Sequence, residues 1–295
     1  MAKDDCGLPD AGTSQRADPA GSSAPDPAVH QNTVGFPTRL CSGWSSYNPG
    51  VQSETFERLR ALNHEFYQTF AARFADKRTR LQPGVLRALE SVSPAATILD
   101  LGCGHGALAE SLIAGGYPTA YLGLDLSAEM IGLARNSVMD SIVRFEQTDL
   151  SLSTWQAVLQ GLPDPFQPPY ALVLSFASLH HIPGAKRRQA LVEEVYPLME
   201  PGSRWILSVW DFLQSERLRE RILPWSSVDI DPDQVEPGDY LMDWRHGGQG
   251  VRYVHHFSPE ALIELAEAVG FEVVETYRMD GENGRLGLYQ VWRKP

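Results

Sequence analysis

The chain has 295 residues, 43% of them hydrophobic, and a formal net charge of −12. This length and composition are typical of a globular protein with one large domain or two small ones. The acidic balance excludes DNA from our expectations and disfavours any large nucleic-acid substrate, because such partners are bound through their phosphates by basic surfaces.

The chain shows no pattern typical of a membrane-spanning or secreted protein. Its longest apolar run begins at Tyr170 and falls far short of the roughly 20 residues that cross a bilayer. The N-terminal segment is acidic and lacks an apolar core, so we expect no secretory signal. Three cysteines at unrelated spacings fit neither a disulfide framework nor a zinc ribbon. We therefore expect a cytoplasmic protein without a bound metal.

Residues 1–50 are rich in Pro, Gly, Ser, Ala and Asp, with few bulky apolar side chains. Such a segment cannot bury enough surface to offset the entropy lost on ordering. We predict a disordered or loosely docked tail over residues 1–50 and a single domain over residues 51–295.

Residues 51–90 are predicted to form a helical lid on this domain. Apolar side chains recur there at steps of three and four residues, which is the spacing of one helix face. A basic cluster follows and is interpreted either as a solvated helix face or as a surface that contacts an anion or the substrate. The apolar positions are Phe56, Leu59, Leu62, Phe66, Phe70 and Phe74, and the basic ones are Arg73, Lys77, Arg78, Arg80 and Arg87.

Strands and helices alternate through the middle of the chain, which predicts a parallel sheet with helices on both faces. One helix has Ser127 at its N-cap, and another begins with Ser153 and Gln156 at the spacing of a capping box. The predicted strands are 97–101, 120–125, 142–150, 171–179 and 204–212, and the predicted helices are 107–116, 127–137, 153–162 and 186–199.

The C-terminal part has a different pattern. Residues 258–271 carry three helix signals, namely an N-cap serine, a proline at the first position and a glycine past the end: Ser258, Pro259 and Gly270. Two further strands, 272–279 and 286–294, are joined by a short turn and predict a hairpin. The expected fold is therefore α/β, a Rossmann-like doubly wound, mostly parallel seven-stranded sheet with an antiparallel last strand. Residues 212–257 form an insertion on the substrate side.

The run ILDLGCGHG, residues 98–106, follows a predicted strand and opens a helix. Glycines at such a turn let the backbone approach a ligand closely and leave the helix N-terminus free to face it. The third glycine comes two residues after the second rather than three, so the spacing disfavours pyrophosphate as the ligand.

Three consecutive strands place an aspartate at the same edge of the sheet, where ligands of open α/β sheets bind. Asp100 is expected to meet backbone amides or a ligand cation, because an unpaired buried carboxylate is costly. Asp125 is placed to accept hydrogen bonds from two ribose hydroxyls. Asp149 closes the third strand, where it is placed to receive an adenine amino group.

Four motifs between about residues 90 and 210 are similar to those of the class I S-adenosylmethionine-dependent methyltransferases: ILDLGCGHG, YLGLDLSAEMI, FEQTDL and LVLSFASLHHI. The resemblance implies S-adenosylmethionine as the cofactor. One departure is Ala171, where many members of the family begin the fourth strand with aspartate. The resemblance places Asp100, Gly102, Cys103 and Gly104 against the methionine part, Asp125, Leu126 and Met130 at the ribose, Asp149 and Leu150 at the adenine, and Ser175 and Phe176 beside the sulfonium.

A narrower resemblance links FYQTFAARFADKRTRLQPGV, SVWDF and RYVHHFSPEAL to the tRNA wobble-uridine carboxymethyl methyltransferases. It implies a carboxylate as the methyl acceptor, which a cationic Arg252 suits. It also implies that Tyr67 and Arg78 close over the cofactor or acceptor. The acceptor pocket would then be lined by Trp210, Arg252, Tyr253 and His255.

The segment VRYVHHF, residues 251–257, alternates in the manner of a strand and is either an exposed edge strand or part of the acceptor site. From Trp225 to Asp243 the insertion holds six acidic residues and no basic one, which disfavours tRNA as the acceptor. The adjacent His180 and His181 point in opposite directions at a strand end, so we expect no shared metal. We expect His180 to face the acceptor.

Three functions stay open at this point. The first is methyl transfer to a small-molecule or modified-nucleoside acceptor, including the tRNA case, with Arg252 orienting a carboxylate. The second is a natural-product O- or N-methyltransferase in which His180 or His255 is the base. The third is a protein that holds cofactor or a partner without turnover. The sequence does not predict the oligomeric state.

Overall fold

The computed structural model describes residues 53–295, apart from 78–79, 91, 93–95, 117–119 and 246–247. The predicted tail over 1–50 and the predicted cofactor residue Arg78 lie outside the described residues. Among the described helices, none is long and apolar enough to cross a membrane.

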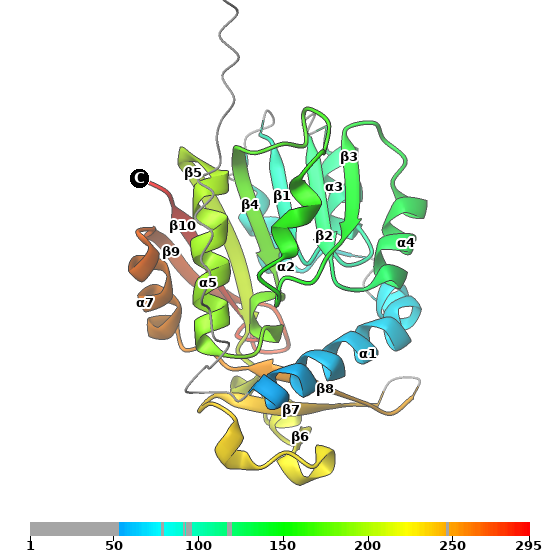
Figure 1. The fold of residues 1–295 in the computed structure, drawn as a ribbon, viewed down its shortest axis with the longest axis vertical. Helices are drawn as coiled ribbons and strands as arrows, with labels where there is room; N and C mark the ends of the chain where they lie inside the picture. Colours follow the sequence, from blue (N-terminus) through cyan, green and yellow to red (C-terminus); the bar gives the residue numbers. More distant parts are fainter. Residues whose placement is uncertain (1–52, 78–79, 91, 93–95, 117–119, 246–247) are drawn as a thin grey trace, which may run out of the picture. The chain divides into compact units, whose positions relative to one another are not determined.

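A seven-stranded sheet has the order β3-β2-β1-β4-β5-β10-β9 (Figure 1). Strands β1 to β5 run parallel to one another. Strand β10 lies between β5 and β9 and is antiparallel to both. This arrangement confirms the fold class predicted from the sequence. The strands are β1 (Ile98–Leu101), β2 (Tyr121–Asp125), β3 (Val143–Gln147), β4 (Tyr170–Phe176), β5 (Met199–Trp210), β9 (Glu272–Met279) and β10 (Gly287–Arg293).

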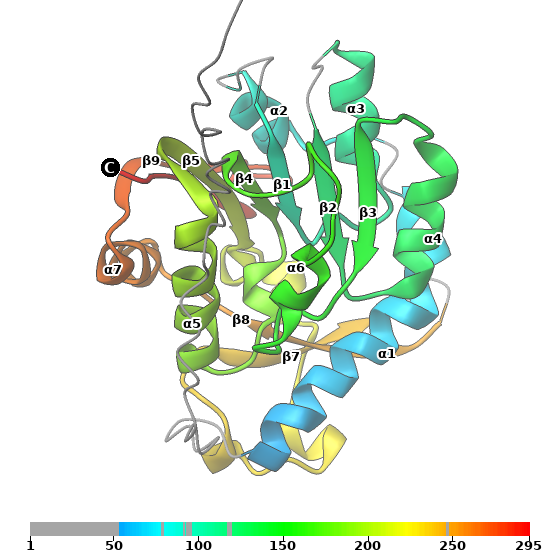
Figure 2. The same ribbon diagram turned by 45° about the horizontal axis from the view of Figure 1, so that its top comes forward.

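Helices cover both faces of this sheet, so alternate side chains of its strands enter two different cores (Figures 1 and 2). In β1, Leu99 and Leu101 pack in one core and Ile98 in the other. Because both faces are buried, the central strands β1, β2 and β4 are apolar at nearly every position rather than at every second one. The first core contains α5 (Ala185–Val195) and α7 (Pro259–Val269), and the second contains α2 (Pro83–Leu89), α3 (Ala107–Ala114) and α4 (Ala128–Ser137).

The helix signals were mostly confirmed. Ser127 caps α4 by accepting from the amide of Met130, and Ser258 caps α7 by accepting from the amide of Ala261. The predicted α-helix over residues 153–162 was wrong: the structure has a short 3₁₀ helix, η1 (Trp155–Leu159). The capping box does not form, because the Gln156 amide donates to the carbonyl of Glu194 and the Trp155 indole donates to the carboxylate of the same residue.

The insertion and the N-terminal helix pack against each other at the carboxyl ends of the parallel strands (Figures 1 and 2). Helix α1 (Ser53–Lys77) lies on strand β8 (Gly250–His255), where Leu59 meets Tyr253. Gly250 is required there, since a Cβ atom would meet the ring of Phe70 at 2.6 Å. The other elements of this region are η2 (Leu179–His181), η4 (Phe212–Gln214), α6 (Glu216–Arg219), β6 (Ile222–Leu223), η5 (Trp225–Val228), η6 (Pro232–Gln234) and β7 (Asp239–Trp244). The remaining element, η3 (Tyr196–Leu198), precedes β5 at the amino ends of the parallel strands.

Strands β6, β7 and β8 form a separate antiparallel sheet in this insertion. Strand β8 is at its edge, but Arg252, Tyr253, Val254 and His255 are all buried. The interpretation of this segment as an exposed edge strand is therefore wrong, because α1 covers it.

Candidate active site

One cavity lies between the carboxyl ends of β1 to β4 on one side and helix α1 on the other. The segment 80–82 and the start of α2 close it further. Most of the residues that the sequence assigned to the cofactor line this cavity together. They are Tyr67, Asp100, Gly102, Cys103, Gly104, Asp125, Leu126, Met130, Asp149, Leu150 and Phe176.

The glycine-rich turn after β1 is shaped for close backbone contact. Gly102 has a φ of +92°, and a Cβ atom there would meet the hydroxyl of Ser178 at 2.5 Å. The amide of Gly104 donates to Oδ2 of Asp125 at 2.9 Å, and the amide of Ser127 donates to Oδ1 of the same residue at 2.9 Å. The Asp125 carboxylate is therefore held in one orientation at the end of β2.

Asp100 is the most perturbed carboxyl group in the cavity. It is 2% exposed and accepts a hydrogen bond from the hydroxyl of Tyr121. Burial raises the pKa of Asp100 to about 7, with a further contribution from the charge of Asp125 and opposition from the Tyr121 hydrogen bond. A carboxyl group in this state gains from a nearby ligand cation, because the cation offsets the cost of the buried negative charge.

Asp149 follows β3 and is held from two sides. Its Oδ1 accepts from the amide of Ser151 at 2.9 Å, and its Oδ2 lies 2.9 Å from Nη1 of Arg60 on α1. Arg60 and Asn63 also line the cavity, and neither was predicted from the sequence. Their spacing from Tyr67 was the available signal, since positions 60, 63 and 67 share one helix face.

His181, not His180, faces the cavity, so the preference for His180 was wrong. Helix η2 turns the chain directly after β4, and His180 turns inward, where it is fully buried and stacks on Trp210 with ring centroids 5.5 Å apart. Nδ1 of His181 donates to the carbonyl of Tyr253 at 3.0 Å, and Nε2 accepts from the hydroxyl of Tyr67 at 2.7 Å.

Arg252 is 4% exposed and lies among aromatic rings. Its guanidinium carbon is 4.2 Å from the ring centre of Trp210, 5.1 Å from that of Phe66 and 5.6 Å from that of Trp244. Burial lowers the pKa of Arg252, and a hydrogen bond with the Tyr67 side chain opposes this effect. Arg252 does not itself line the cavity but lies behind Tyr67 and Trp210, which do.

Within the described residues, Nε and Nη1 of Arg252 are buried and have no hydrogen-bond partner. No carboxylate of the described chain forms an ion pair with this guanidinium. A buried cation without an anion is destabilising unless a ligand supplies the negative charge.

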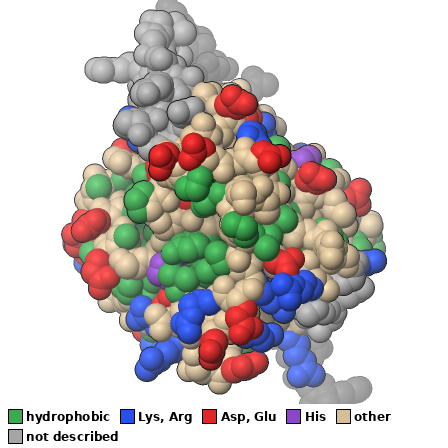
Figure 3. All heavy atoms as spheres, turned by 90° about the horizontal axis from the view of Figure 1, so that it is seen from below, with side chains coloured by type: hydrophobic (Ala, Val, Ile, Leu, Met, Phe, Trp, Pro, Cys, Tyr) green, Lys and Arg blue, Asp and Glu red, His purple; other side chains and the backbone are tan. Residues whose placement is uncertain are grey.

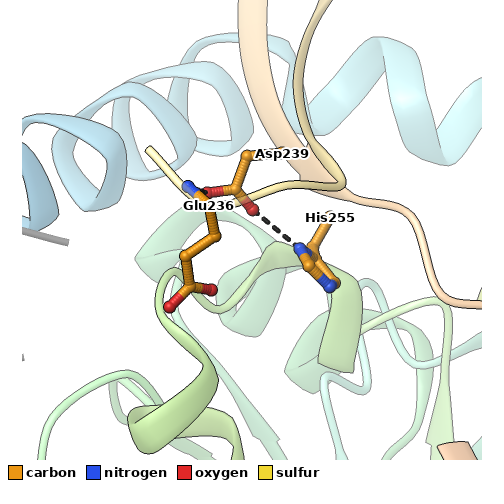
Figure 4. Close-up of side chains that lie close together, drawn as sticks. All are labelled: Glu236, Asp239 and His255. Atoms are coloured by element: carbon orange, nitrogen blue, oxygen red, sulfur yellow. Dashed lines mark hydrogen bonds and ion pairs between the residues drawn. The ribbon is translucent and has the colours of Figure 1, made fainter. Parts of the chain in front are cut away.

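His255 and Tyr253 do not reach the cavity, which corrects their assignment to the acceptor pocket. Nδ1 of His255 donates to Asp239 at 2.7 Å (Figure 4). Its Nε2 lies 3.2 Å from the guanidinium of Arg188. Because Arg188 can only donate, Nε2 must accept, so the imidazole is neutral. Burial lowers the pKa of His255, and both ring nitrogens are used. This arrangement leaves no free nitrogen to act as a base.

Two further observations concern the same network and β4. The side chains of Glu236, Asp239 and His255 are close enough to share an ion, but Arg188 lies 2.9 Å from Glu236 and already supplies a positive charge there. Ser175 is 2% exposed within β4 and is not part of the cavity lining, in contrast to the neighbouring Phe176.

An open, doubly wound sheet with a cavity at its strand ends defines an enzyme that binds a nucleotide-type cofactor. The profile of the methyltransferase-domain family matches residues 69–276, which is more than half of the chain. The chain therefore belongs to the methyltransferase-domain family.

Individual relatives agree with this assignment. A putative methyltransferase of Encephalitozoon cuniculi is 26% identical over 72% of this chain and 88% of its own length. The tRNA (carboxymethyluridine(34)-5-O)-methyltransferase ALKBH8 of Macaca fascicularis is 27% identical over 58% of this chain, but the match spans only 24% of that relative. A crystal structure of a SAM-dependent methyltransferase from Methanosarcina mazei is 22% identical, with a TM-score of 0.54 over 72% of this chain and 98% of its own.

The fold is thus that of the S-adenosylmethionine-dependent methyltransferases, as the sequence motifs predicted. Enzymes of this class take their methyl group from S-adenosylmethionine. The strand-end aspartates and the glycine turn that line the cavity fit such a cofactor, since they offer backbone amides and carboxylates to its amino acid and ribose parts.

Proposed function

We propose that this enzyme transfers the methyl group of S-adenosylmethionine to a carboxylate oxygen of its acceptor, which Arg252 orients. The observation that carries the proposal is the buried guanidinium of Arg252, which has two nitrogen atoms without a partner within the described residues. The carboxylate of the acceptor supplies the missing negative charge. It enters next to the Tyr67 hydroxyl, which lines the cavity in front of Arg252.

The chemistry of a carboxylate acceptor suits the groups that surround the cavity. A carboxylate needs no base to remove a proton, so the protein has to position it in line with the sulfonium and exclude water. Trp210 and Tyr67 provide the walls next to Arg252, and Asp100, Asp125 and Asp149 hold the cofactor. His181 accepts from Tyr67 and fixes the orientation of that side chain.

Among the relatives, the macaque protein is named for methylation of a carboxymethyluridine in tRNA, which supports an acceptor of the carboxymethyl type. The surface favours a small molecule or nucleoside over an intact tRNA. Figure 3 shows acidic and basic side chains intermingled on one face, around a hydrophobic patch, rather than a continuous basic surface. A net charge of −12 points the same way.

The two alternatives from the sequence receive less support. Neither His180 nor His255 lines the cavity, and His181, which does, uses both ring nitrogens to bond Tyr67 and the carbonyl of Tyr253. A binding protein without turnover would have no need for a buried cation beside an otherwise complete cofactor site.

The test uses S-adenosylmethionine labelled in its methyl group, incubated with the enzyme and a cell extract separated into tRNA, protein and small-molecule fractions. Methyl esters are cleaved by mild alkali, whereas N-methyl groups and ethers are not. We expect label in the small-molecule fraction that alkali releases as volatile methanol. Alkali-stable product would overturn the carboxylate acceptor, and alkali-labile product in tRNA would show that the acceptor is a carboxymethyl nucleoside within RNA.

A further inference from the structure

Helix α1 presents three polar side chains to the cavity, and each holds a different part of the site. Arg60, Asn63 and Tyr67 follow one another at steps of three and four residues and all line the cavity. Tyr67 donates to His181, and Asn63 donates to the carbonyl of His181 at 3.0 Å. The side-chain oxygen of Asn63 also accepts from the amide of Tyr253 at 2.8 Å. These contacts fix α1 over the acceptor half of the cavity.

Arg60 lies one turn nearer the start of α1, at the half of the cavity where Asp149 and Leu150 are expected to meet adenine. Its Nη1 is 2.9 Å from Asp149, and the two side chains are only 29% and 13% exposed. An ion pair so shielded from water is screened less than a surface pair and is held more firmly. Its other guanidinium nitrogens bond Glu57, which is half-exposed and lies on the same helix.

We propose that Arg60 is a cofactor-positioning residue that latches helix α1 to the end of strand β3 through Asp149 and so retains bound S-adenosylmethionine. The inference rests on the proposed cofactor. Asp149 Oδ1 is held by Ser151, so the carboxylate keeps a fixed position whether or not the latch is closed. On closure, Arg60 therefore moves together with α1, whereas Asp149 keeps its position at the end of β3.

Release of the cofactor requires α1 to separate from the strand ends, because the cavity lies between them. At the acceptor half this separation breaks hydrogen bonds, and at the adenine half it breaks an ion pair between two oppositely charged side chains. The ion pair makes the dissociation rate sensitive to salt, since opening exposes both charges to water, where dissolved ions stabilise them. A residue that merely supports the fold would not confer this sensitivity.

The experiment measures dissociation of S-adenosylhomocysteine from the full-length protein by stopped-flow tryptophan fluorescence, with Trp210 in the cavity wall as the reporter. The dissociation rate constant of the wild-type protein should rise with added KCl. In R60Q it should be about tenfold higher at low salt, which matches the loss of about 1.4 kcal/mol of binding, and should no longer respond to KCl. R60K keeps the positive charge but lacks the planar set of donors of the guanidinium. Its dissociation rate constant should therefore lie between those of the wild type and R60Q.

Two further variants separate the latch from a general loss of structure. E57Q removes the exposed partner of Arg60 but leaves the bond to Asp149, so its rate constant should stay within twofold of wild type. D149N combined with R60Q should be no faster than D149N alone, because either change opens the latch. Thermal unfolding of each ligand-free variant shows whether it is folded.

An R60Q rate constant within twofold of wild type overturns the latch, and so does a faster rate that keeps the wild-type salt response. Additive effects of R60Q and D149N overturn it as well. Failure of the wild-type protein to bind S-adenosylhomocysteine would contradict the proposed cofactor itself, and that outcome is distinct from failure of the latch.

Discussion

The hydroxyl of Tyr67 donates a 2.7 Å hydrogen bond to Nε2 of His181, so helix α1 is joined to the turn that follows the fourth strand of the sheet. The imidazole of His181 is bonded through both ring nitrogens. Its Nδ1 lies 3.0 Å from the carbonyl of Tyr253 and must carry the proton, because a carbonyl only accepts. Tyr67 is thereby oriented with its hydroxyl next to both His181 and Arg252.

Replacing Tyr67 by Phe should weaken both the fold and the reaction. The change removes a hydroxyl that serves two partly or fully buried partners, which costs about 1–3 kcal/mol of unfolding free energy. We expect methyl transfer to fall about tenfold, a rate effect equivalent to about 1.4 kcal/mol, because the acceptor wall loses its orientation. Urea unfolding and labelled-methyl transfer measure the two effects. Y240F is the matched control, since Tyr240 packs against Phe212 outside the cavity, and equal behaviour of the two variants would contradict the role of Tyr67.

Arg252 should be required for methyl transfer, but its buried charge should lower the stability of the folded protein. Replacement by Met keeps the length of the side chain and removes a buried cation that has no carboxylate partner among the described residues, and burying such a charge is costly. R252M should therefore unfold at the same or a higher urea concentration than the wild type. Its methyl transfer should drop at least about a hundredfold, equivalent to about 2.7 kcal/mol, with the affinity for S-adenosylhomocysteine within twofold.

The same two measurements on R219M provide the control, because Arg219 is an exposed residue that bonds only the carbonyl of Leu213. It should match the wild type in both. An R252M enzyme that keeps near-wild-type activity would rule out Arg252 as the group that orients the acceptor.

Asp100 should make the stability of the ligand-free protein depend on pH. Burial raises the pKa of Asp100 from 3.8 to about 7, so the folded state binds the proton more tightly than the unfolded state. The contribution of this group to stability is then fully present below about pH 3.8 and is lost as the pH rises through about 7. In D100N this dependence should disappear, and the variant should be more stable than the wild type at pH 8 but not at pH 4.

Urea unfolding of both proteins across this pH range, without cofactor, measures the difference. D140N is the control, since Asp140 is exposed and caps only the amide of Ile142. Parallel pH profiles for the wild type and D100N would show that the Asp100 carboxyl is not perturbed in the folded protein.

The cofactor half of the site could be predicted because its residues follow local rules. Asp100 and Asp125 lie at the ends of adjacent parallel strands. The carboxyl ends of parallel strands lie at the same edge of the sheet, whatever the conformation of the loops that connect them. Gly102 lies in a turn that requires a positive φ and that the motif itself reveals.

The acceptor half depends on contacts between distant parts of the chain, so the sequence did not determine it. His180 and His181 are neighbours, and only the turn of η2 decides which of them faces the cavity. Arg60 meets a residue 89 positions further along the chain. In the sequence His255 resembled a free base in a short strand. Its partner Arg188 lies on helix α5, 67 positions away in the chain.

Asp239 should be a structural anchor rather than a metal ligand. Its carboxylate accepts from the hydroxyl of Tyr253 at 2.7 Å, from Nδ1 of His255 at 2.7 Å and from the amide of Glu236 at 3.0 Å. D239A leaves these donors unpaired in a buried site, and we expect a loss of about 3 kcal/mol or more of unfolding free energy. E264A, at an exposed position of α7, should change stability by no more than about 0.5 kcal/mol.

A metal-chelating agent distinguishes the two interpretations of this cluster without any mutation. Because the guanidinium of Arg188 already lies within hydrogen-bond distance of both Glu236 and His255, a divalent cation there would face direct repulsion. Dialysis against EDTA should leave the melting temperature and the methyl-transfer rate unchanged. A melting temperature that falls on dialysis and recovers with one particular divalent cation would show that Glu236, Asp239 and His255 bind a metal, and D239A would then lose that recovery.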